Sequence, residues 1–321
     1  MDWIAVKAAL LAEGRVRIVG APAKEYIASS SAGPGAGGAG SVFFSVGGRR
    51  VRLAVDPDAP LTLVHEGKGN AAIPFRGEMV RGVLEAPALH CPRQAFITLT
   101  PGCIFSCRYC AVPACSGGSR TTAEVVAMVR SVLERIDAIS ITSGVAGSVE
   151  EEERRTVEVV RALVRFGLPI GVSIYPTADT PRLLREAGAD EVKFNLEAAT
   201  PGIFAEMCPG LDWNLIWEVL VESVRLFGKN HVQSNIIVGL GESDDEIEAA
   251  VHRLCSIGVI PILRPLTPSA GCAHLRRPDA GRLMRLNEIA TREIREGGLD
   301  PAEAQTMCVA CAGCDLMPGR E

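Results

Sequence analysis

Two tight groups of cysteines are the residues whose type and spacing point most directly to chemistry. The first group places three thiols within eight residues, at Cys103, Cys107 and Cys110. The second group has the spacing CxxCxxC near the end of the chain, at Cys308, Cys311 and Cys314. Thiolates are soft ligands that iron–sulfur clusters and zinc both prefer. Both groups are therefore candidate metal centres.

The first group fits a [4Fe–4S] cluster better than a zinc ion. Three thiolates hold three of the four irons and leave the fourth iron open to a substrate or cofactor. A structural zinc site needs four protein ligands, and the nearest partner pair, Cys308 and Cys311, lies far along the chain. A disulfide-stapled loop is less favoured, because nothing in the sequence points to export.

The second group is most simply an auxiliary iron–sulfur cluster, since small residues between its cysteines permit a compact wrap. Alternatives that stay open are a zinc site completed by a distant residue and a disordered reactive tail. The candidates for a fourth ligand, besides the substrate, are Cys91, Cys272, Asp315 and Arg320. The five cysteines outside the two groups are Cys91, Cys115, Cys208, Cys255 and Cys272. They are expected to be small buried apolar residues, above all Cys208 and Cys255.

The composition limits the classes of protein to which the chain can belong. Its 321 residues are 47% hydrophobic, which is enough for one large domain or a large and a small one. A net charge of −5 gives no basic footprint for nucleic acid. We expect no membrane span, because the sequence has no apolar run of the necessary length. The first residues do not read as a signal peptide, so a cytoplasmic protein is expected.

Strands and helices alternate from about residue 92 onward. Apolar strand patterns cover 95–100, 138–143, 169–175, 191–196, 232–238 and 259–263. Helical patterns follow these strands, and Ser243 with Glu246 predicts a capping box at the start of one helix. Six such units predict an α/β fold with a parallel sheet, either a partial TIM barrel, (β/α)6, or a doubly wound sheet.

Three parts are expected along the chain. Residues 1–91 form a small N-terminal β-containing subdomain, with a short amphipathic start (3–11) and a mobile Gly-rich loop (29–41). A β-hairpin over 41–56 turns at Gly47-Gly48. Residues 92–298 form the partial barrel, and residues 299–321 form a C-terminal tail that carries the second cysteine group.

Chemistry in both α/β architectures lies at the carboxyl ends of the strands. Several polar, cysteine or glycine residues fall at such ends. In chain order these are Cys103, Ser143 with Gly144, Tyr175, Glu197, Gly239 to Gly241, and Arg264.

The CxxxCxxC loop with Tyr109, followed by six βα units across about residues 92–298, resembles the radical S-adenosylmethionine (SAM) superfamily. The resemblance implies that SAM binds the open iron of a [4Fe–4S] cluster. One electron then splits SAM into methionine and a 5′-deoxyadenosyl radical, which abstracts a hydrogen atom from the substrate. It also implies an electron donor such as ferredoxin or flavodoxin.

The resemblance also implies residues that bind SAM. Tyr109 lies beside the adenine, and the backbone at Ser143-Gly144 holds the methionyl amino group, although the family's usual Gly-Gly-Glu is Thr-Ser-Gly here. Glu197 binds the ribose or the amino group, and Asn195 faces the barrel interior. The remaining cofactor positions are Gly239 and Gly241 beside the adenine, and Tyr175 by its place at a strand end. No arginine stands out for the SAM carboxylate.

The stretch from Met207 to Gly210, with SNIIVGLGE, resembles the biotin-synthase-like branch of this superfamily. The tail cysteines and the N-terminal β-subdomain look most like archaeal two-protein lipoyl synthases. This likeness implies sulfur insertion into an octanoyl chain on a protein lysine, with a second radical SAM protein and a lipoyl-carrier protein as partners. Biotin synthase itself fits less well, because its second cluster is held by cysteines inside the barrel strands.

Two other functions stay open. One is radical rearrangement or metallocofactor maturation, in which the second cluster binds substrate or passes electrons. The other is a non-catalytic iron–sulfur scaffold. Arg264 and Cys272 are the possible catalytic side chains, and Arg264 is suited to bind a carboxylate. The histidines show no ligand spacing and are expected to be surface or packing residues: His65, His90, His231, His252 and His274. His274 follows the sixth strand together with Cys272, so these two residues are candidates to face the site.

Overall fold

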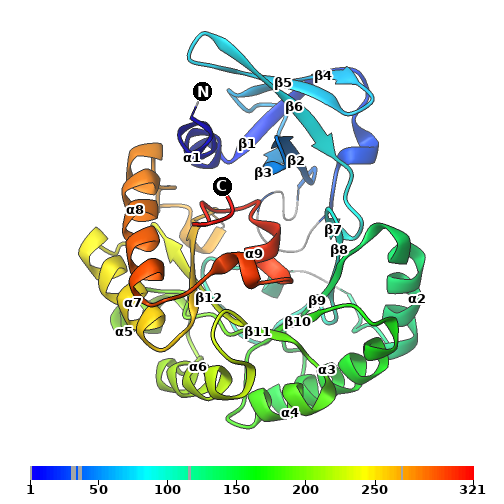
Figure 1. Ribbon diagram of the computed structural model, residues 1–321, viewed down its shortest axis with the longest axis vertical. Coiled ribbons are helices and arrows are strands. Elements are labelled where there is room, and N and C mark those ends of the chain that lie inside the picture. The colour runs from blue at the N-terminus through cyan, green and yellow to red at the C-terminus, as the bar shows by residue number, and fades with distance from the viewer. Residues whose placement is uncertain (1, 30–33, 35–37, 115–116, 269) are drawn as a thin grey trace.

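The structure, a computed structural model, contains a closed N-terminal β-barrel and a curved open sheet (Figure 1). It describes residues 2–29, 34, 38–114, 117–268 and 270–321. The loop predicted over 29–41 lies largely outside these residues, as does Cys115. No helix in the described part of the chain is long and apolar enough to cross a membrane.

The N-terminal barrel is larger than the hairpin that the sequence predicted. It follows helix α1 (Trp3–Glu13) and closes in the order β1-β3-β2-β6-β5-β4. Its strands are β1 (Arg15–Gly20), β2 (Ser41–Val46), β3 (Arg49–Val55), β4 (Thr62–Gly67), β5 (Asn70–Phe75) and β6 (Glu78–Glu85). The predicted hairpin is confirmed as β2 and β3, where Gly47 and Gly48 take positive φ angles of 60° and 84° that suit a two-residue turn. We refer to this unit as the N-terminal barrel.

The second sheet confirms the predicted partial TIM barrel. Its strands neighbour one another in chain order, as a barrel requires and a doubly wound sheet does not. Strands β8 to β13 are parallel, and β7 is an antiparallel addition at the edge. The strands are β7 (His90–Cys91), β8 (Gln94–Thr98), β9 (Ala138–Thr142), β10 (Ile170–Ser173), β11 (Glu191–Lys193), β12 (Val232–Val238) and β13 (Ile260–Pro265).

Helices cover the outer face of the partial barrel, and apolar side chains from both layers form its core (Figure 1). They are α2 (Thr122–Val132), α3 (Val149–Leu163), α4 (Thr180–Ala187), α5 (Pro201–Met207), α6 (Trp213–Phe227), α7 (Asp244–Ser256) and α8 (Ala280–Glu296). The predicted capping box of Ser243 and Glu246 is confirmed at the start of α7. Short 3-10 turns occupy Lys24–Tyr26, Val112–Ala114, Leu133–Arg135, Val164–Phe166, Ala270–Cys272 and Pro301–Glu303.

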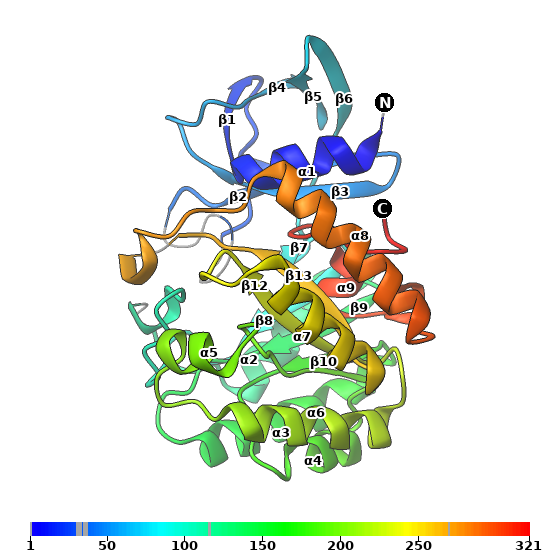
Figure 2. The same cartoon turned by 90° about the vertical axis from the view of Figure 1, so that its left-hand side faces the viewer.

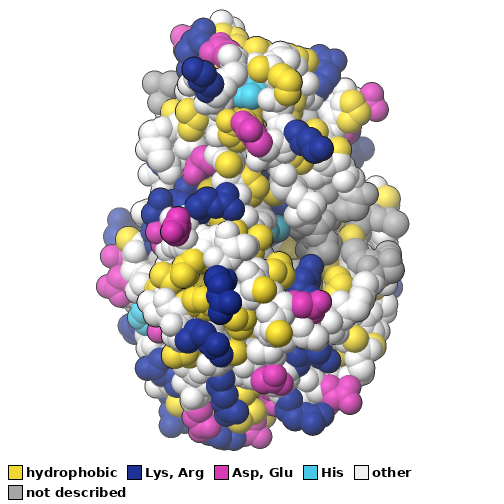
Figure 3. Space-filling view, turned by 90° about the vertical axis from the view of Figure 1, so that its right-hand side faces the viewer, with side chains coloured by type: hydrophobic (Ala, Val, Ile, Leu, Met, Phe, Trp, Pro, Cys, Tyr) yellow, Lys and Arg dark blue, Asp and Glu magenta, His cyan; other side chains and the backbone are white. Residues whose placement is uncertain are grey.

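The N-terminal barrel lies above the partial barrel, and α1 packs against α8 (Figure 2). Basic and acidic side chains are interspersed on the face shown in Figure 3. This mixed surface agrees with the net charge of −5.

The C-terminal tail folds back across the amino ends of the barrel strands and carries helix α9 (Met307–Cys311) (Figure 1). The buried Glu191 carboxylate at the start of β11 accepts hydrogen bonds from Gln305 N at 2.6 Å and from Thr306 N at 3.1 Å. It also accepts one from the Thr306 hydroxyl at 2.6 Å. Gly171 on β10 lets the tail approach closely, because a Cβ there would lie 2.1 Å from Thr306 Oγ1. The tail therefore plugs the lower mouth of the partial barrel.

Candidate functional site

One cavity of about 620 Å³ lies inside the partial barrel and beneath the N-terminal barrel. The first cysteine group approaches it from the carboxyl ends of the strands, and the second approaches it from the tail that plugs the amino ends. All six thiols line this cavity: Cys103, Cys107, Cys110, Cys308, Cys311 and Cys314. Two groups that are distant in sequence therefore face a shared space.

The loop that carries the first group extends the pairing of β8 with β9. Leu99 N donates to Thr142 O at 2.8 Å, and Gly144 N donates to Thr100 O at 2.9 Å. Further along the loop, Ile104 N donates to Val145 O at 2.7 Å. These bonds fix the loop just before and after its first cysteine, on the side of β9.

Gly144 and Ser143 secure this contact. A Cβ at Gly144 would lie 2.1 Å from the carbonyl oxygen of Gly102, so only glycine allows the approach. The Ser143 hydroxyl accepts a hydrogen bond from Thr100 N at 2.9 Å and donates to the buried Glu152 carboxylate at 2.5 Å. The Ser143 side chain is thus engaged in holding the loop, and both residues line the cavity.

The three thiols of the first group differ in their surroundings. A hydrogen bond from Cys208 lowers the pKa of Cys107, while burial raises the pKa of Cys110 to about 12. All three are partly exposed and belong to one loop. These three thiols would hold three irons of a [4Fe–4S] cluster.

Strand β11 and the residues after it present alternating polar side chains to the cavity: Lys193, Asn195 and Glu197. Glu197 has a positive φ of 63°, and its backbone pairs with β12 through Asn235 O and Ile237 N, each at 2.8 Å. Burial raises the pKa of its carboxyl group, which accepts hydrogen bonds from Asn195 and Tyr109. Burial also raises the pKa of Tyr109, so this phenol stays protonated and serves as a donor.

Tyr175 lines the cavity with its ring edge-to-face on Phe105, the centroids being 5.1 Å apart. Its hydroxyl accepts a hydrogen bond from Asp212 N at 2.9 Å. Gly239 and Gly241 do not belong to the cavity lining among the described residues. Their loop is held by Glu242, which accepts from Gly239 N at 2.7 Å, so these glycines serve a turn at positive φ.

Arg264 and Cys272, the two possible catalytic residues, have different surroundings. Arg264 lines the cavity, and its Nη2 lies 3.1 Å from Asp315 Oδ2. Cys272 is fully buried in an apolar cluster with Leu266 and Cys208, and it does not line the cavity among the described residues. His274 is also absent from that lining.

Cationic side chains surround the second cysteine group. Lys193 Nζ donates to Cys308 Sγ at 3.2 Å, and Arg264 hydrogen-bonds the same sulfur. A hydrogen bond from Cys91 lowers the pKa of Cys311 to about 6, whereas burial raises the pKa of Cys314. Buried cations beside thiols suit a thiolate-ligated, anionic cluster.

No three His, Cys, Asp or Glu side chains in the described ranges are grouped closely enough to hold a single metal ion. The four irons of a cube separate its thiolates, so a cluster does not require its ligands to meet at one point. The second group therefore offers a donor set of the right chemistry for a cluster, with charge compensation already in place.

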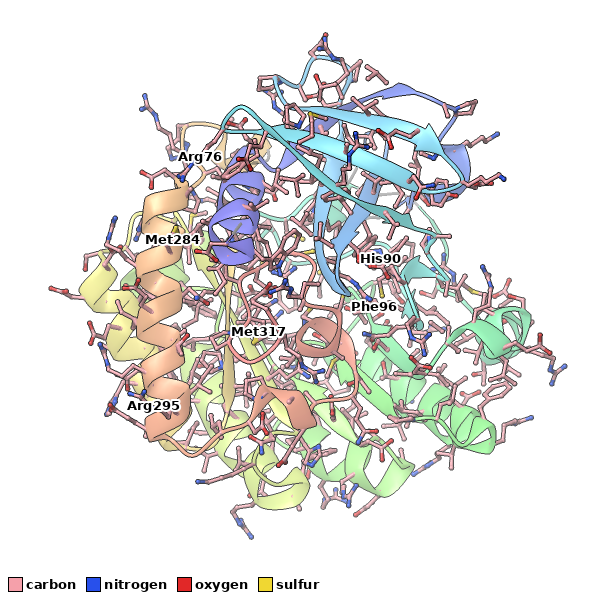
Figure 4. All side chains as sticks on the ribbon, turned by 45° about the horizontal axis from the view of Figure 1, so that its top comes forward. Arg76, His90, Phe96, Met284, Arg295 and Met317 are labelled. Carbon is pink, nitrogen blue, oxygen red and sulfur yellow. The ribbon has the colours of Figure 1, made fainter. Side chains whose placement is uncertain are left out.

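Several cavity residues were missed from the sequence, including Arg52, His90 and Arg277, whereas Cys91 was already a candidate fourth ligand. His90 lies beside Phe96 at the edge of the sheet, below the N-terminal barrel (Figure 4). Burial and the nearby Arg52 lower the pKa of His90 to about 3, so its imidazole is neutral. Arg52 Nη1 lies 3.1 Å from His90 Nε2 and donates to it. These residues come from the N-terminal barrel, its link to the sheet and the segment after β13, where no motif marks them.

Lys193 is the missed residue that a sequence signal could have revealed. It lies two positions before Asn195 and four before Glu197, and alternate residues of a strand share one face. Since the resemblance placed Asn195 toward the barrel interior, this alternation would have placed Lys193 there as well.

Comparison with known proteins identifies the class. The model of the Radical SAM superfamily matches residues 97–254, the stretch that carries the CxxxCxxC loop and the strand-end residues of β9 to β12. The chain belongs to the radical SAM superfamily. Membership implies a [4Fe–4S] cluster, SAM and an electron donor, and the first cysteine group fits that cluster.

The curated relatives are similar over a short stretch. Lipoyl synthase from Delftia acidovorans is 34% identical over 97 residues, which is 30% of this chain and 29% of the relative. Lipoyl synthase from Variovorax paradoxus is 33% identical over the same shares. The match thus covers less than a third of the length of these relatives.

Solved structures share the fold at low identity. Streptococcus suis SuiB bound to SAM superposes with a TM-score of 0.54 at 14% identity, covering 64% of this chain and 48% of that one. The FeFe-hydrogenase maturase HydG from Carboxydothermus hydrogenoformans gives 0.52 at 17% identity, covering 64% and 52%. These likenesses support the partial-barrel architecture.

Proposed function

We propose that this radical SAM enzyme inserts sulfur at unactivated carbon atoms, as a lipoyl-synthase-like sulfurtransferase, and that its second cysteine group holds an auxiliary [4Fe–4S] cluster. The observation that carries the proposal is the shared cavity, which both cysteine groups line. The partial similarity to lipoyl synthases supports the same reaction class. We propose an octanoyl chain on a protein lysine as substrate.

The SAM-binding end of the cavity is assigned to the first cysteine group and its neighbours. When bound to Cys103, Cys107 and Cys110, the cluster supplies the electron that splits SAM. Glu197, protonated or charged, offers oxygen atoms to SAM hydroxyl or amino groups, and Asn195 orients its carboxyl group by a hydrogen bond. Tyr109 also donates to Glu197, so its ring is held at the cavity wall.

The other cofactor-binding positions act through the backbone or by shape. The Ser143-Gly144 backbone edge is proposed to face the methionyl group, while the Ser143 hydroxyl keeps the cluster loop in place. Tyr175 forms a wall of the cavity through its packing on Phe105. Gly239 and Gly241 are proposed to contribute to cofactor binding indirectly, by setting the turn of the loop after β12.

The middle of the cavity suits an apolar substrate chain. The cavity walls include apolar side chains, among them Phe96, Ile174 and Ile237. An acyl chain gains free energy by leaving water for such walls, at about 0.8 kcal/mol per buried methylene group. The tail closes the lower mouth of the barrel and thereby excludes water from the path of a carbon radical.

The tail end of the cavity is assigned to sulfur supply. Cys308, Cys311 and Cys314 would hold the auxiliary cluster, which would supply sulfide sulfur to the carbon radical left by hydrogen abstraction, with one electron passing to the cluster irons. Lys193 and Arg264 compensate the negative charge of the thiolates, and Asp315 in turn orients Arg264. On this view the three expected parts, 1–91, 92–298 and 299–321, act as cover, radical-generating barrel and sulfur-supplying tail.

The proposal is tested by supplying SAM, dithionite and an octanoyl-lysyl peptide to protein whose cluster sulfide is isotopically labelled. We expect 5′-deoxyadenosine and a thiolated peptide that carries the label. The Cys308/Cys311/Cys314→Ala variant should still release 5′-deoxyadenosine but give no thiolated peptide. The matched control is Cys255→Ala, which alters a buried cysteine of α7 outside the cavity and should leave both products unchanged.

Release of 5′-deoxyadenosine without transfer of labelled sulfur would reject the proposal. A second function would then be favoured, namely rearrangement or cofactor maturation with an auxiliary cluster that only binds substrate or passes electrons. The specific observation in its favour is that both cysteine groups line one cavity, an arrangement that also suits electron transfer between two clusters. Repeated turnover without loss of the second cluster identifies that function.

Partners follow from the proposed reaction. Ferredoxin or flavodoxin is the proposed electron donor, and a second radical SAM protein and a lipoyl-carrier protein are the proposed protein partners. Titrating each into the peptide assay measures its effect on the yield of thiolated product.

A further inference from the structure

The edge hairpin of the partial barrel brings a fourth thiol to the second cysteine group. Cys91 ends β7 and is only 1% exposed. Its thiol donates a hydrogen bond to Cys311, and it lines the same cavity as the three tail cysteines. Four thiols from two distant segments therefore line one cavity, and two of them are in contact.

The position of Cys91 is fixed by the backbone of the hairpin. Cys91 pairs with Gln94 across the turn between β7 and β8, and its carbonyl oxygen accepts from Ala88 N at 3.0 Å. The side chain therefore points to the cavity from a paired segment of the sheet.

The same hairpin holds the tail. The Gln94 side chain accepts from Met307 N at 2.9 Å and donates to Met307 O at 3.1 Å. Met307 directly precedes Cys308, and all of these bonds are buried. One residue of the hairpin thus sets the register of the tail cysteines relative to Cys91.

The other candidates for a fourth ligand are less suited. Asp315 lines the cavity, but its carboxylate lies 3.1 Å from the Arg264 guanidinium, which neutralises it. Cys272 packs in the apolar cluster next to Tyr109, on the side of the first cysteine group. Arg320 donates to the carbonyl oxygen atoms of Pro301, Ala302 and Ala304 and does not line the cavity among the described residues.

We propose that Cys91 is the fourth protein ligand of the auxiliary cluster, so that the tail cysteines and the edge hairpin together hold all four irons. This inference rests on the proposed function, because it concerns the cluster assigned to the tail. A thiolate is the preferred protein ligand of such clusters, and Cys91 contacts the tail thiol of Cys311. The cluster would then tie the N-terminal segment, the sheet and the tail into one unit.

The test isolates the second site in the full-length chain. A Cys103/Cys107/Cys110→Ala parent is reconstituted anaerobically, and its iron is counted and examined by Mössbauer and electron paramagnetic resonance (EPR) spectroscopy. We expect about four irons per chain in one cubane, as for a fully ligated [4Fe–4S] centre. Added cyanide should leave the parent's EPR spectrum unchanged, because no iron is open.

Adding Cys91→Ala to this parent should open one iron. We expect either loss of about one iron to give a [3Fe–4S] signal, or a four-iron cluster whose EPR spectrum shifts when cyanide is added. Cys91→Ser, which keeps the size and offers an oxygen ligand, should retain the iron but change the spectrum, and it covers the case in which the alanine variant does not fold. Cys255→Ala in the same parent should match the parent.

The outcomes separate the two proposals. A parent without iron would reject the auxiliary cluster itself. The role of Cys91 alone would be overturned if the parent holds a cluster and both Cys91→Ala and Cys91→Ser give the parent's spectrum. In that case neither variant spectrum would respond to cyanide. A cyanide response created by Asp315→Asn and not by Cys91→Ala would overturn it in favour of Asp315.

Discussion

A single methyl group placed at Gly144 should disrupt SAM cleavage, because that glycine lets β9 meet the loop of the first cysteine group. In Gly144→Ala the added Cβ would lie 2.1 Å from Gly102 O, whereas ordinary contact begins at 3.4 Å. Gly102 directly precedes Cys103. The loop must therefore move by about 1 Å, at a cost of about 1–3 kcal/mol in strain.

The displacement acts directly on the cluster ligands. The bonds from Gly144 N to Thr100 O and from Ile104 N to Val145 O, at 2.9 and 2.7 Å, bracket Cys103 and would lengthen. A misplacement of about 1 Å at a reacting centre costs on the order of 100-fold in rate. We expect the rate of 5′-deoxyadenosine release to fall by about that factor, with weaker SAM binding.

The assay measures iron content, SAM affinity and 5′-deoxyadenosine under dithionite. The matched control is Gly202→Ala in α5, where an added Cβ meets nothing within 4 Å and where alanine favours the helix. Wild-type activity in Gly144→Ala, with normal activity in the control, would refute the close approach as a requirement for the cluster loop.

Three further predictions concern the tail and the helical layer. Glu191→Ala removes the acceptor of three hydrogen bonds from the tail. Amide hydrogen exchange of residues 305–314 should therefore accelerate by the equivalent of about 3 kcal/mol, while exchange in the sheet stays slow. Unchanged exchange in the tail would show that Glu191 does not hold it in place. Lys193→Met removes the cation that hydrogen-bonds Cys308. Because a cation stabilises the more negative reduced state, the reduction potential of the auxiliary cluster should fall by on the order of 50 mV in an EPR redox titration. An unaltered potential would place Lys193 away from the cluster. The hydrogen bond from His252, at 2.7 Å, lowers the pKa of Glu293, so this carboxylate stabilises the fold above its unfolded-state pKa and loses that effect as the pH falls. Glu293→Gln should therefore lower the free energy of unfolding, measured by urea titration, by about 1 kcal/mol near neutral pH and by progressively less toward pH ~4. A difference in unfolding free energy between variant and wild type that does not change with pH would contradict the role of the Glu293 carboxylate.

The sequence determined the repeated architecture and the first cysteine group. Parallel strands between amphipathic helices leave a local periodic pattern, and six such units with short links permit few topologies. The CxxxCxxC loop is a local motif whose spacing already selects its chemistry. Glu197 was found because it follows a predicted strand and matches an acidic residue of the family, and Asn195 because the resemblance placed it toward the barrel interior; both line the cavity.

Tertiary structure decided which distant residues share the cavity. The tail reaches the lower mouth of the barrel through contacts with Glu191 and Gln94, more than a hundred residues away in sequence, and no local pattern encodes such a docking site. The same contacts bring the tail cysteines to Cys91. The closed N-terminal barrel was also hidden, because its closure depends on pairing β1 with β4 across the intervening hairpin.

The roles of the glycines and buried polar residues show the same division. Gly239 and Gly241 occur at a strand end, as the sequence indicated, yet only the folded loop shows that they form a turn behind the cavity wall. Gly144 was visible as a glycine, but its requirement comes from the Gly102 carbonyl across the sheet. Local spacing along the chain therefore specified the cluster loop and the partial barrel. Long-range packing specified which segments line the cavity together, because a contact between distant segments leaves no periodic pattern in the sequence.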